Sequence, residues 1–412
     1  MKFLLSFILI FNCTIFSFAQ NTTQQIIPGA DRTDVYVPLL KGKRIGVFAN
    51  QTSIVGNINL IDTLINLGIN VTKIFSPEHG FRGNADAGAS TTNSIDSATH
   101  VPIVSLYGKK NKPTAEDLKD VDILLFDIQD VGVRFYTYIS SLQYFMEAAF
   151  ENSKPLMILD RPNPNGFYID GPVLDTNYKS FIGMQPVPVV YGMTIGEYAM
   201  MIAGEGWLTS DAANKKYNWY KNVAQNSADT PFHFLVIKCI NYDHSSKYKL
   251  PVKPSPNLPD IGSVNWYPST CFFEGTNISE GRGTTEPFQI FGAPSLPKNM
   301  TAFTPVSKPG ATDPKYLNQT CYGWNVSDII ADDKKLNLQY LIDAYKLFPD
   351  KNNFFITPKS GDYFFNKLAG NSILIQQLKD GKTEAEIRAS WQPALNQFKQ
   401  IRKKYLLYDD FN

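Results

Sequence analysis

Short runs of apolar and β-branched residues alternate with stretches of helical periodicity along the first part of this chain. The run at 123–126 (ILLF) contains no polar residue, which is typical of a parallel strand buried on both faces. After it, residues 137–152 carry an apolar stripe at helical spacing. The strand-like runs are residues 43–50, 71–75, 103–107, 121–126 and 156–159. This alternation predicts an α/β fold with a mostly parallel sheet covered by helices on both faces.

The second part of the chain has a different character. Prolines crowd residues 251–259 (PVKPSPNLP), which indicates a stiff connector unsuited to a helix or a central strand. A glycine-rich, charged stretch follows, and helical patterns return at 336–348 and 384–405. We therefore expect one domain over residues 20–259 and a smaller α+β domain over residues 260–412.

The first residues have the form of a signal peptide. A lysine at position 2 precedes an almost wholly apolar stretch at 3–18, and Ser17-Phe18-Ala19 has the small-x-small pattern of a cleavage site before Gln20. No later run approaches the roughly 18 apolar residues that a membrane-spanning helix needs. We expect residues 1–19 to be removed and the protein to be exported, to a periplasm or to the cell exterior.

Composition narrows the range of partners. Lys and Arg number 39 against 38 Asp and Glu, so the chain has no bulk charge to attract nucleic acid or an anionic membrane. Cys239, Cys271 and Cys321 lie far apart outside the signal peptide, which permits one disulfide but not a disulfide scaffold. No pattern in the sequence indicates the oligomeric state.

Charged residues follow three of the strand-like runs directly. The run at 71–75 leads into Ser-Pro-Glu-His-Gly-Phe-Arg-Gly, and we expect its Glu78 to be a catalytic acid. The carboxyl ends of parallel strands meet at one edge of a sheet, so residues after the other two runs should join Glu78 in one cleft. A single aspartate after a strand is more often a helix cap or a turn residue, and Asp130 could simply pair with Arg134 four residues on.

Several other kinds of catalytic site have no motif here. The four histidines form no His-Glu-x-x-His motif, and the cysteines have no paired spacing for a metal. The Gly-x-Ser-x-Gly elbow of serine hydrolases and the phosphate-binding P-loop are both absent. The run GRGTTE at 281–286 lacks the third glycine of a dinucleotide fingerprint. We therefore expect neither a metal nor an organic cofactor.

Carboxylates remain, and they suit glycoside hydrolysis. That reaction typically uses one carboxylic acid to protonate the leaving oxygen and a second group to attack or to activate water. With Glu78 as the acid, we take Asp127 and Asp130 as the first candidates for the second role. Asp160, Glu280 and Glu286 are also available. The arginines near these acids indicate an anionic group on the substrate.

Five blocks of the sequence resemble the exo-β-N-acetylmuramidase (NamZ-like) family, long catalogued as a domain of unknown function. They are FSPEHGFRG at 75–83, FDIQDVGVRFYTYISSL at 126–142, DRPNPNG at 160–166, KPSPNLP at 253–259 and EGRGTTEPFQIFGAP at 280–294. The resemblance implies a Rossmann-like N-terminal domain without a nucleotide, a smaller C-terminal domain and an active site in the cleft between them. It also implies that the enzyme releases terminal N-acetylmuramic acid from the non-reducing end of peptidoglycan fragments. The family's catalytic glutamate corresponds to Glu78.

The expected partners are thus peptidoglycan saccharides that contain N-acetylmuramic acid, whose lactyl carboxylate could account for the arginines. We expect the substrate to be bound by His79, Arg82, Arg134, Tyr136, Asp160, Arg161, Asn163, Glu280, Arg282, Thr284, Thr285 and Glu286. A non-catalytic protein that binds peptidoglycan fragments is the main alternative, and a metal-dependent amidase or deacetylase is a third. The sequence leaves a retaining, an inverting and a substrate-assisted mechanism equally open.

Overall fold

The computed structural model describes residues 24–78, 80–81, 92–222, 232–331, 334–359 and 361–411. The expected signal peptide and the expected site residues His79 and Arg82 lie outside this described part.

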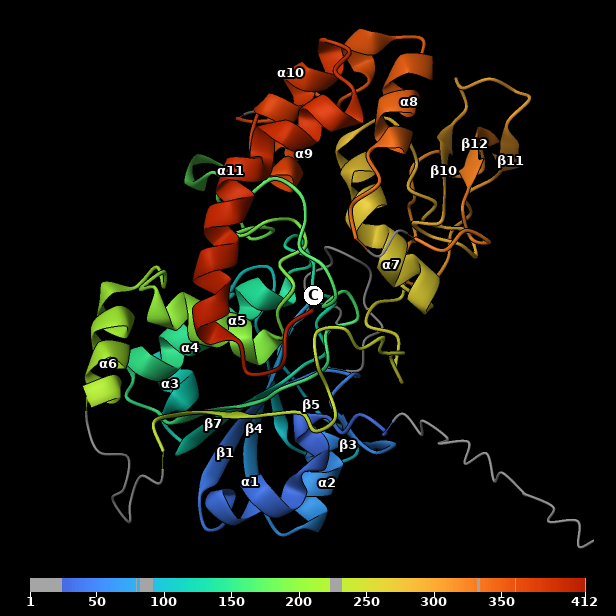
Figure 1. Ribbon diagram of the computed structural model, residues 1–412. Coiled ribbons are helices and arrows are strands. Elements are labelled where there is room, and N and C mark those ends of the chain that lie inside the picture. Colours follow the sequence, from blue (N-terminus) through green and yellow to red (C-terminus); the bar gives the residue numbers. More distant parts are fainter. Residues whose placement is uncertain are drawn as a thin grey trace, which may run out of the picture.

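A mostly parallel sheet of seven strands forms the centre of the first half of the molecule (Figure 1). Its order is β5-β6-β4-β1-β7-β8-β9, and all neighbours are parallel except β5 and β6. The strands are β1 (Arg44–Ala49), β4 (Asn70–Ser76), β5 (Ser94–Ile95), β6 (Pro102–Ser105), β7 (Ile123–Asp127), β8 (Leu156–Leu159) and β9 (Phe234–Ile237). The predicted α/β class is confirmed, whereas β9 at the edge was not foreseen from the sequence.

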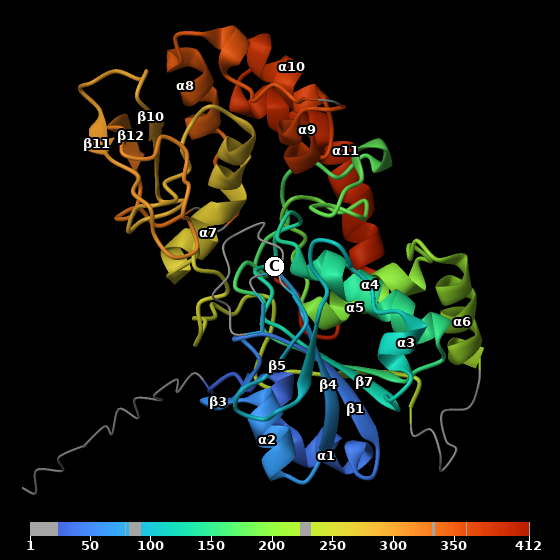
Figure 2. The same ribbon diagram turned by 180° about the vertical axis from the view of Figure 1, so that it is seen from behind.

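Helices cover both faces of this sheet, which explains the uninterrupted apolar runs (Figures 1 and 2). Along β1, Val47 packs into one hydrophobic core and Phe48 into another. The first core contains side chains of α1 (Thr33–Leu40) and α2 (Leu60–Asn66). The second contains side chains of α4 (Tyr138–Glu151), α5 (Ile195–Gly204) and α6 (Asp211–Asn222). A strand between two dry layers buries side chains on both faces, so its apolar residues need not alternate with polar ones.

Smaller elements complete the first half. They are α3 (Ala115–Leu118), the hairpin of β2 (Ile54–Val55) and β3 (Ile58–Asn59), and the 3-10 turns Gly29–Asp31 and Thr176–Tyr178. In the described residues no helix combines the length and the apolar character that crossing a membrane requires.

The second half combines helices with a small antiparallel sheet (Figure 1, top). It begins with α7 (Ile261–Thr270), directly after the proline-rich connector. The sheet has the order β10-β12-β11, from β10 (Ile290–Ala293), β11 (Thr301–Phe303) and β12 (Cys321–Asn325). The remaining helices are α8 (Gln339–Leu347), α9 (Phe364–Ala369), α10 (Ile373–Lys379) and α11 (Glu384–Arg402), with 3-10 turns at Cys271–Gly275, Lys351–Asn353 and Lys403–Tyr405.

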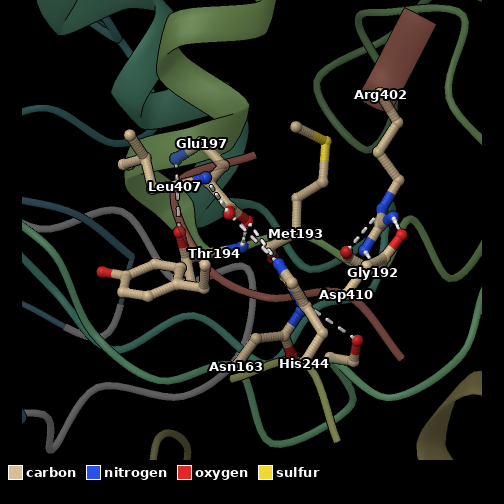
Figure 3. Close-up of polar contacts among 12 residues, drawn as sticks. Asn163, Gly192, Met193, Thr194, Glu197, His244, Arg402, Leu407 and Asp410 are labelled. Atoms are coloured by element: carbon tan, nitrogen blue, oxygen red, sulfur yellow. Dashed lines mark hydrogen bonds and ion pairs between the residues drawn. The ribbon is translucent and has the colours of Figure 1, made fainter. Parts of the chain in front are cut away.

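The last helix and the C-terminal segment return to the first half of the molecule. In Figures 1 and 2, α11 runs from the upper helices down to α5. Arg402 at its end donates from Nε to the Gly192 carbonyl at 2.7 Å and pairs with Asp410 (Figure 3). Beside it, the buried Glu197 carboxylate accepts from the backbone N–H of Leu407 at 2.7 Å and lies 3.0 Å from His244 Nε2. Buried polar contacts therefore hold the chain end on the sheet domain.

Candidate active site

A cavity of about 570 Å³ is lined by residues that follow strands β4 and β6 and by residues of the second half of the chain. This volume is within the range of small-molecule sites, roughly 300–1,000 Å³. The first half contributes Glu78, Tyr107, Phe135, Tyr136, Thr137 and Ile182. The connector and the second half contribute Ser255, Asn257, Leu258, Tyr267, Glu274, Glu280, Arg282, Phe288, residues 310–315 and Phe364. Both parts of the chain therefore build one cavity.

Glu78 lies two residues beyond the end of β4 and is half-buried in this cavity. Tyr107 donates its phenolic O–H to Glu78 Oε1, and Thr137 donates its hydroxyl to Glu78 Oε2, both at 3.0 Å. Tyr107 follows β6, the neighbour of β4, and Thr137 precedes α4. The carboxyl ends of two adjacent strands thus bring Glu78 and Tyr107 together, and the start of α4 adds Thr137. Tyr107 and Thr137 are not among the site residues expected from the sequence, although they lie in the predicted strand 103–107 and the predicted helix 137–152.

Two acids and two bases form a charged wall on the opposite half of the chain. Arg282 donates from Nη2 to Glu274 at 2.6 Å, and its Nε lies 3.2 Å from Glu280. Lys315 Nζ lies 3.1 Å from Glu280 and donates to four backbone carbonyls between 273 and 278 at 2.8–3.2 Å. Burial acts to raise the pKa of Glu280, but Lys315 and Arg282 outweigh it and lower that pKa. Glu280 is therefore ionised within a neutralising network.

Aromatic side chains form another part of the lining. Tyr136 and Phe135 pack edge-on against Tyr267, with ring centroids 6.1 and 5.3 Å apart. The Tyr136 hydroxyl donates to the carbonyl of Pro254 at 2.9 Å, which fixes the proline-rich connector against the sheet edge. Tyr136, one of the expected substrate-binding residues, lines the cavity. Such surfaces suit the apolar faces of a sugar ring.

The structure does not place Asp127 and Arg161 in the cavity lining. Arg161 donates to both carboxylate oxygens of Asp127, from Nε at 2.6 Å and from Nη2 at 2.8 Å, and both side chains are buried. A buried bidentate pair satisfies both charges and leaves neither for a substrate. The expected catalytic role of Asp127 and binding role of Arg161 are replaced by a structural role.

Asp130 is also buried away from the cavity lining. Its Oδ2 accepts from the N–H of Gly132 at 2.7 Å and from the Tyr191 hydroxyl. Gly132 has φ +75°, and a Cβ there would lie 2.1 Å from Asn163 Oδ1, so only glycine fits this turn. Burial raises the pKa of Asp130 to about 6, against the lowering effect of these hydrogen bonds. The aspartate stabilises a turn, in contrast to its expected catalytic role.

Asp160 and Asn163 organise the loop after β8 and do not line the cavity. Asp160 accepts from the hydroxyls of Thr194 at 2.7 Å and Tyr408 at 2.6 Å and from the Gly196 N–H at 2.8 Å. Asn163 donates to the Met193 carbonyl at 2.7 Å (Figure 3). These contacts satisfy buried backbone and side-chain groups, so the expected substrate contacts of both residues are corrected to structural ones.

Arg134 neither lines the cavity, as a substrate-binding residue would, nor pairs with Asp130. Its guanidinium is buried and donates to the carbonyls of Pro172, Val187 and Leu368 at 2.7, 2.9 and 2.7 Å. Burial lowers the pKa of Arg134 to about 9. Arg134 joins the two halves of the chain.

The remaining expected residues divide between the wall and the surface behind it. Glu280 and Arg282 line the cavity, whereas Thr284, Thr285 and Glu286 do not. Thr284 closes its own turn by donating to the Gly281 carbonyl, Thr285 is exposed, and Glu286 accepts from Asn325. Among the described residues, the acids that share the cavity with Glu78 are Glu274, Glu280 and Asp313.

The part of the chain that the structure describes contains neither a cluster of metal-binding side chains nor a disulfide. No group of three or more His, Cys, Asp or Glu side chains there could hold a metal ion. Cys239, Cys271 and Cys321 are each buried and free. Burial raises the pKa of all three thiols, which keeps them protonated and unreactive.

Comparison with known proteins covers both halves of the chain. Residues 45–262 match the family described as "Exo-beta-N-acetylmuramidase NamZ, N-terminal", and residues 265–408 match its C-terminal counterpart. The chain is 40% identical over 395 residues to the peptidoglycan beta-N-acetylmuramidase NamZ of Bacillus subtilis (strain 168), covering 90% of this chain and 89% of that protein.

Solved structures of two DUF1343 family proteins from Bacteroides fragilis NCTC 9343 are also similar. One has a TM-score of 0.81 at 45% identity and covers 94% of this chain and 99% of its own. The other has a TM-score of 0.73 at 29% identity, covering 93% and 99%.

Proposed function

The chain belongs to the exo-β-N-acetylmuramidase NamZ family, and we propose that it releases terminal β-linked N-acetylmuramic acid from the non-reducing end of peptidoglycan fragments. The observation that carries the proposal is Glu78, a carboxyl group held by two hydroxyls inside a cavity that both halves of the chain line. The 40% identity with a named peptidoglycan beta-N-acetylmuramidase extends over most of the chain. Family and site chemistry therefore agree.

In this proposal Glu78 is the general acid. It donates its proton to the glycosidic oxygen while the bond between that oxygen and the anomeric carbon breaks, so the bonding electrons leave with the departing sugar as a neutral hydroxyl. Water later supplies the hydroxyl of the anomeric carbon, and its other proton returns to the Glu78 carboxylate. The sugar would bind in the same cavity that Glu274, Glu280 and Arg282 of the charged wall line.

Arg282 is the proposed partner of the lactyl carboxylate. It lines the cavity, and its side chain is 20% exposed. Its contacts to Glu274 and Glu280 engage Nη2 and Nε, and a guanidinium carries five N–H donors. The group can therefore hold both glutamates and still donate to a substrate anion. Arg134 and Arg161 are buried and engaged in other contacts. Of the expected substrate-binding arginines that the structure describes, Arg282 is therefore the one that can take this role.

We also propose that the protein acts outside the cytoplasm, after removal of residues 1–19. The support is the signal-like pattern of the first residues and the chemistry of the substrate, since peptidoglycan fragments occur in the cell wall.

The test of the catalytic proposal compares two leaving groups in wild type and Glu78→Gln. The substrates are a 4-nitrophenyl β-N-acetylmuramide and an N-acetylmuramic acid β-linked to N-acetylglucosamine. Loss of a general acid should cost roughly 10²–10⁴-fold in kcat for the sugar leaving group. The loss should be smaller for 4-nitrophenol, a weaker base that departs without full protonation.

The matched control is Glu205→Gln. This carboxylate also accepts a tyrosine hydroxyl, from Tyr405 at 2.7 Å, but it lies outside the cavity. It should keep wild-type kcat. Equal losses on both substrates in Glu78→Gln would contradict the acid role, and a wild type that binds both sugars without turnover would favour the non-catalytic alternative.

A further inference from the structure

Thr137 occupies the N-cap position of α4 without capping it. Its side chain makes no hydrogen bond to the first turn of the helix. By contrast, Thr114, Thr194 and Thr383 accept backbone hydrogen bonds at the starts of α3, α5 and α11, each in a full capping box. A threonine at this position normally stabilises the helix by such a bond. In α4 the hydroxyl of Thr137 points to Glu78 Oε2 instead, at 3.0 Å.

Tyr107 supplies the second hydroxyl, to Glu78 Oε1 at 3.0 Å. Its ring is half-buried and packs against Phe181 with centroids 5.9 Å apart, so the phenol has a fixed direction. Burial, and next the neighbouring Glu78, raise the pKa of the Tyr107 phenol. The phenol therefore stays protonated and remains a hydrogen-bond donor at any pH at which the protein works.

We infer that Tyr107 and Thr137 are positioning residues for Glu78, which hold its two carboxylate oxygens in the orientation for proton transfer. The inference rests on the proposed function of Glu78 and adds two residues to it. One donor on each oxygen fixes the plane of the carboxylate, because rotation of the group would break both bonds at once. Each hydroxyl can also turn and accept, so the arrangement persists when Glu78 carries a proton. The pair thus resembles the outer residues that orient metal ligands and catalytic bases elsewhere.

Two readouts separate a positioning role from a merely structural one. They are the split between kcat and KM, and rescue by a variant that keeps the hydroxyl.

The variants are Tyr107→Phe and Thr137→Val, which remove one hydroxyl each and keep the shape of the side chain. We expect kcat on the β-linked disaccharide to fall about 10–100-fold in each, with KM changed less than about 3-fold, because misorientation costs the chemical step more than binding. We expect Thr137→Ser, which keeps a hydroxyl, to stay within about 3-fold of wild type. Combined with Glu78→Gln, neither variant should lower the remaining rate further.

Thr383→Val is the matched control. Thr383 caps α11 through a capping box and lies outside the cavity. Its loss should lower the melting temperature by roughly 1–3 °C and leave kcat unchanged. Thr137→Val, which removes no cap, should show the reverse: little change in melting temperature and a large loss of kcat.

The outcomes separate the two proposals. If Glu78→Gln loses turnover while Tyr107→Phe and Thr137→Val keep wild-type kcat, the positioning inference is wrong and the catalytic role of Glu78 stands. If Glu78→Gln keeps turnover, the catalytic role itself fails. Should Thr137→Val not fold, Tyr107→Phe decides alone, and an unchanged kcat in that folded variant overturns the inference.

Discussion

Three arginines of this molecule have different partners and therefore different roles. Arg161 is neutralised by one buried carboxylate, and Arg134 meets three carbonyls and, among the described residues, no carboxylate. Arg282 has two carboxylates and a face of Phe288 5.1 Å away, at the wall of the cavity. Of these three arginines, Arg282 alone lines the cavity in which we propose that the sugar binds. Recognition of the substrate anion therefore belongs to Arg282 in this account.

A charge-removal cycle tests that assignment. We compare the 4-nitrophenyl β-N-acetylmuramide with its lactyl methyl ester, in wild type and in Arg282→Lys. Wild type should discriminate against the ester by about 10–100-fold in kcat/KM, because a charged, bidentate contact is lost. Arg282→Lys keeps the charge but not the planar fork, so it should lose most of this discrimination.

Two checks accompany this cycle. Arg282 also pairs with Glu274 and Glu280, so thermal unfolding must show that the variant is folded. If a folded Arg282→Lys discriminates against the ester as strongly as wild type, another group holds the lactyl carboxylate.

Asp130 makes the stability of the fold depend on pH. Burial raises its pKa to about 6, whereas in an unfolded chain an aspartate titrates near 3.9. Below about pH 4 the carboxyl is protonated in both states and its contribution to stability is fully present. Between about pH 4 and 6 only the unfolded chain loses the proton, so stability falls as pH rises and the contribution is lost above the folded pKa.

Asp130→Asn should remove this dependence, because the amide resembles the neutral carboxyl. The free energy of unfolding of the variant minus that of wild type should rise between pH 4 and 7 by up to about 3 kcal/mol, at about 1.4 kcal/mol per pH unit. Urea denaturation at four pH values measures it, with the exposed Asp380→Asn as control. Parallel curves for Asp130→Asn and wild type would show that Asp130 is ionised in the fold throughout.

At the scale of elements, the sequence predicted the strands well and the side-chain directions poorly. The predicted runs at 43–50, 71–75, 103–107, 121–126 and 156–159 all overlap parallel strands of the sheet. Those at 123–126 and 156–159 are uninterrupted apolar sequence, which suits strands between two dry faces. Strand β9 was missed, although its residues Phe-Leu-Val-Ile form an apolar run like those of the predicted strands. It lies at the edge of the sheet, where Phe234 is half-exposed.

The same limit explains the corrected site residues. Asp127, Asp130 and Asp160 do end strands or follow them, as expected, but a strand end has several directions in which a side chain can turn. Asp127 turns to Arg161, 34 residues away in sequence, and Arg134 reaches Leu368, 234 residues away. Such distant partners leave no local signal. Glu78 could be singled out as a candidate acid that lines the cavity, but its hydroxyl partners could not.

At the scale of the whole molecule, buried polar contacts fasten the second half of the chain to the sheet domain. Arg134 reaches α9, where Gly370 in a left-handed conformation (φ +76°) ends the helix and leaves room for the guanidinium. Asp170 accepts from Arg388 of α11 and from the N–H of Leu336 at 2.7 Å. These contacts keep Glu78 and Arg282 on the walls of one cavity.

The proposed action at a chain end requires a pocket that accepts one sugar and stops there. Residues from both halves of the chain line the cavity, as such a pocket would need. We therefore expect specificity for the sugar at the non-reducing end.

The most direct test offers the wild-type protein two disaccharides of opposite order. One has N-acetylmuramic acid β-linked to a reducing-end N-acetylglucosamine, and the other has N-acetylglucosamine β-linked to a reducing-end N-acetylmuramic acid. Mass spectrometry of the products should show free N-acetylmuramic acid from the first only, and none from the first when Glu78→Gln replaces wild type. Cleavage of the second at a comparable rate, or of neither, would contradict the account.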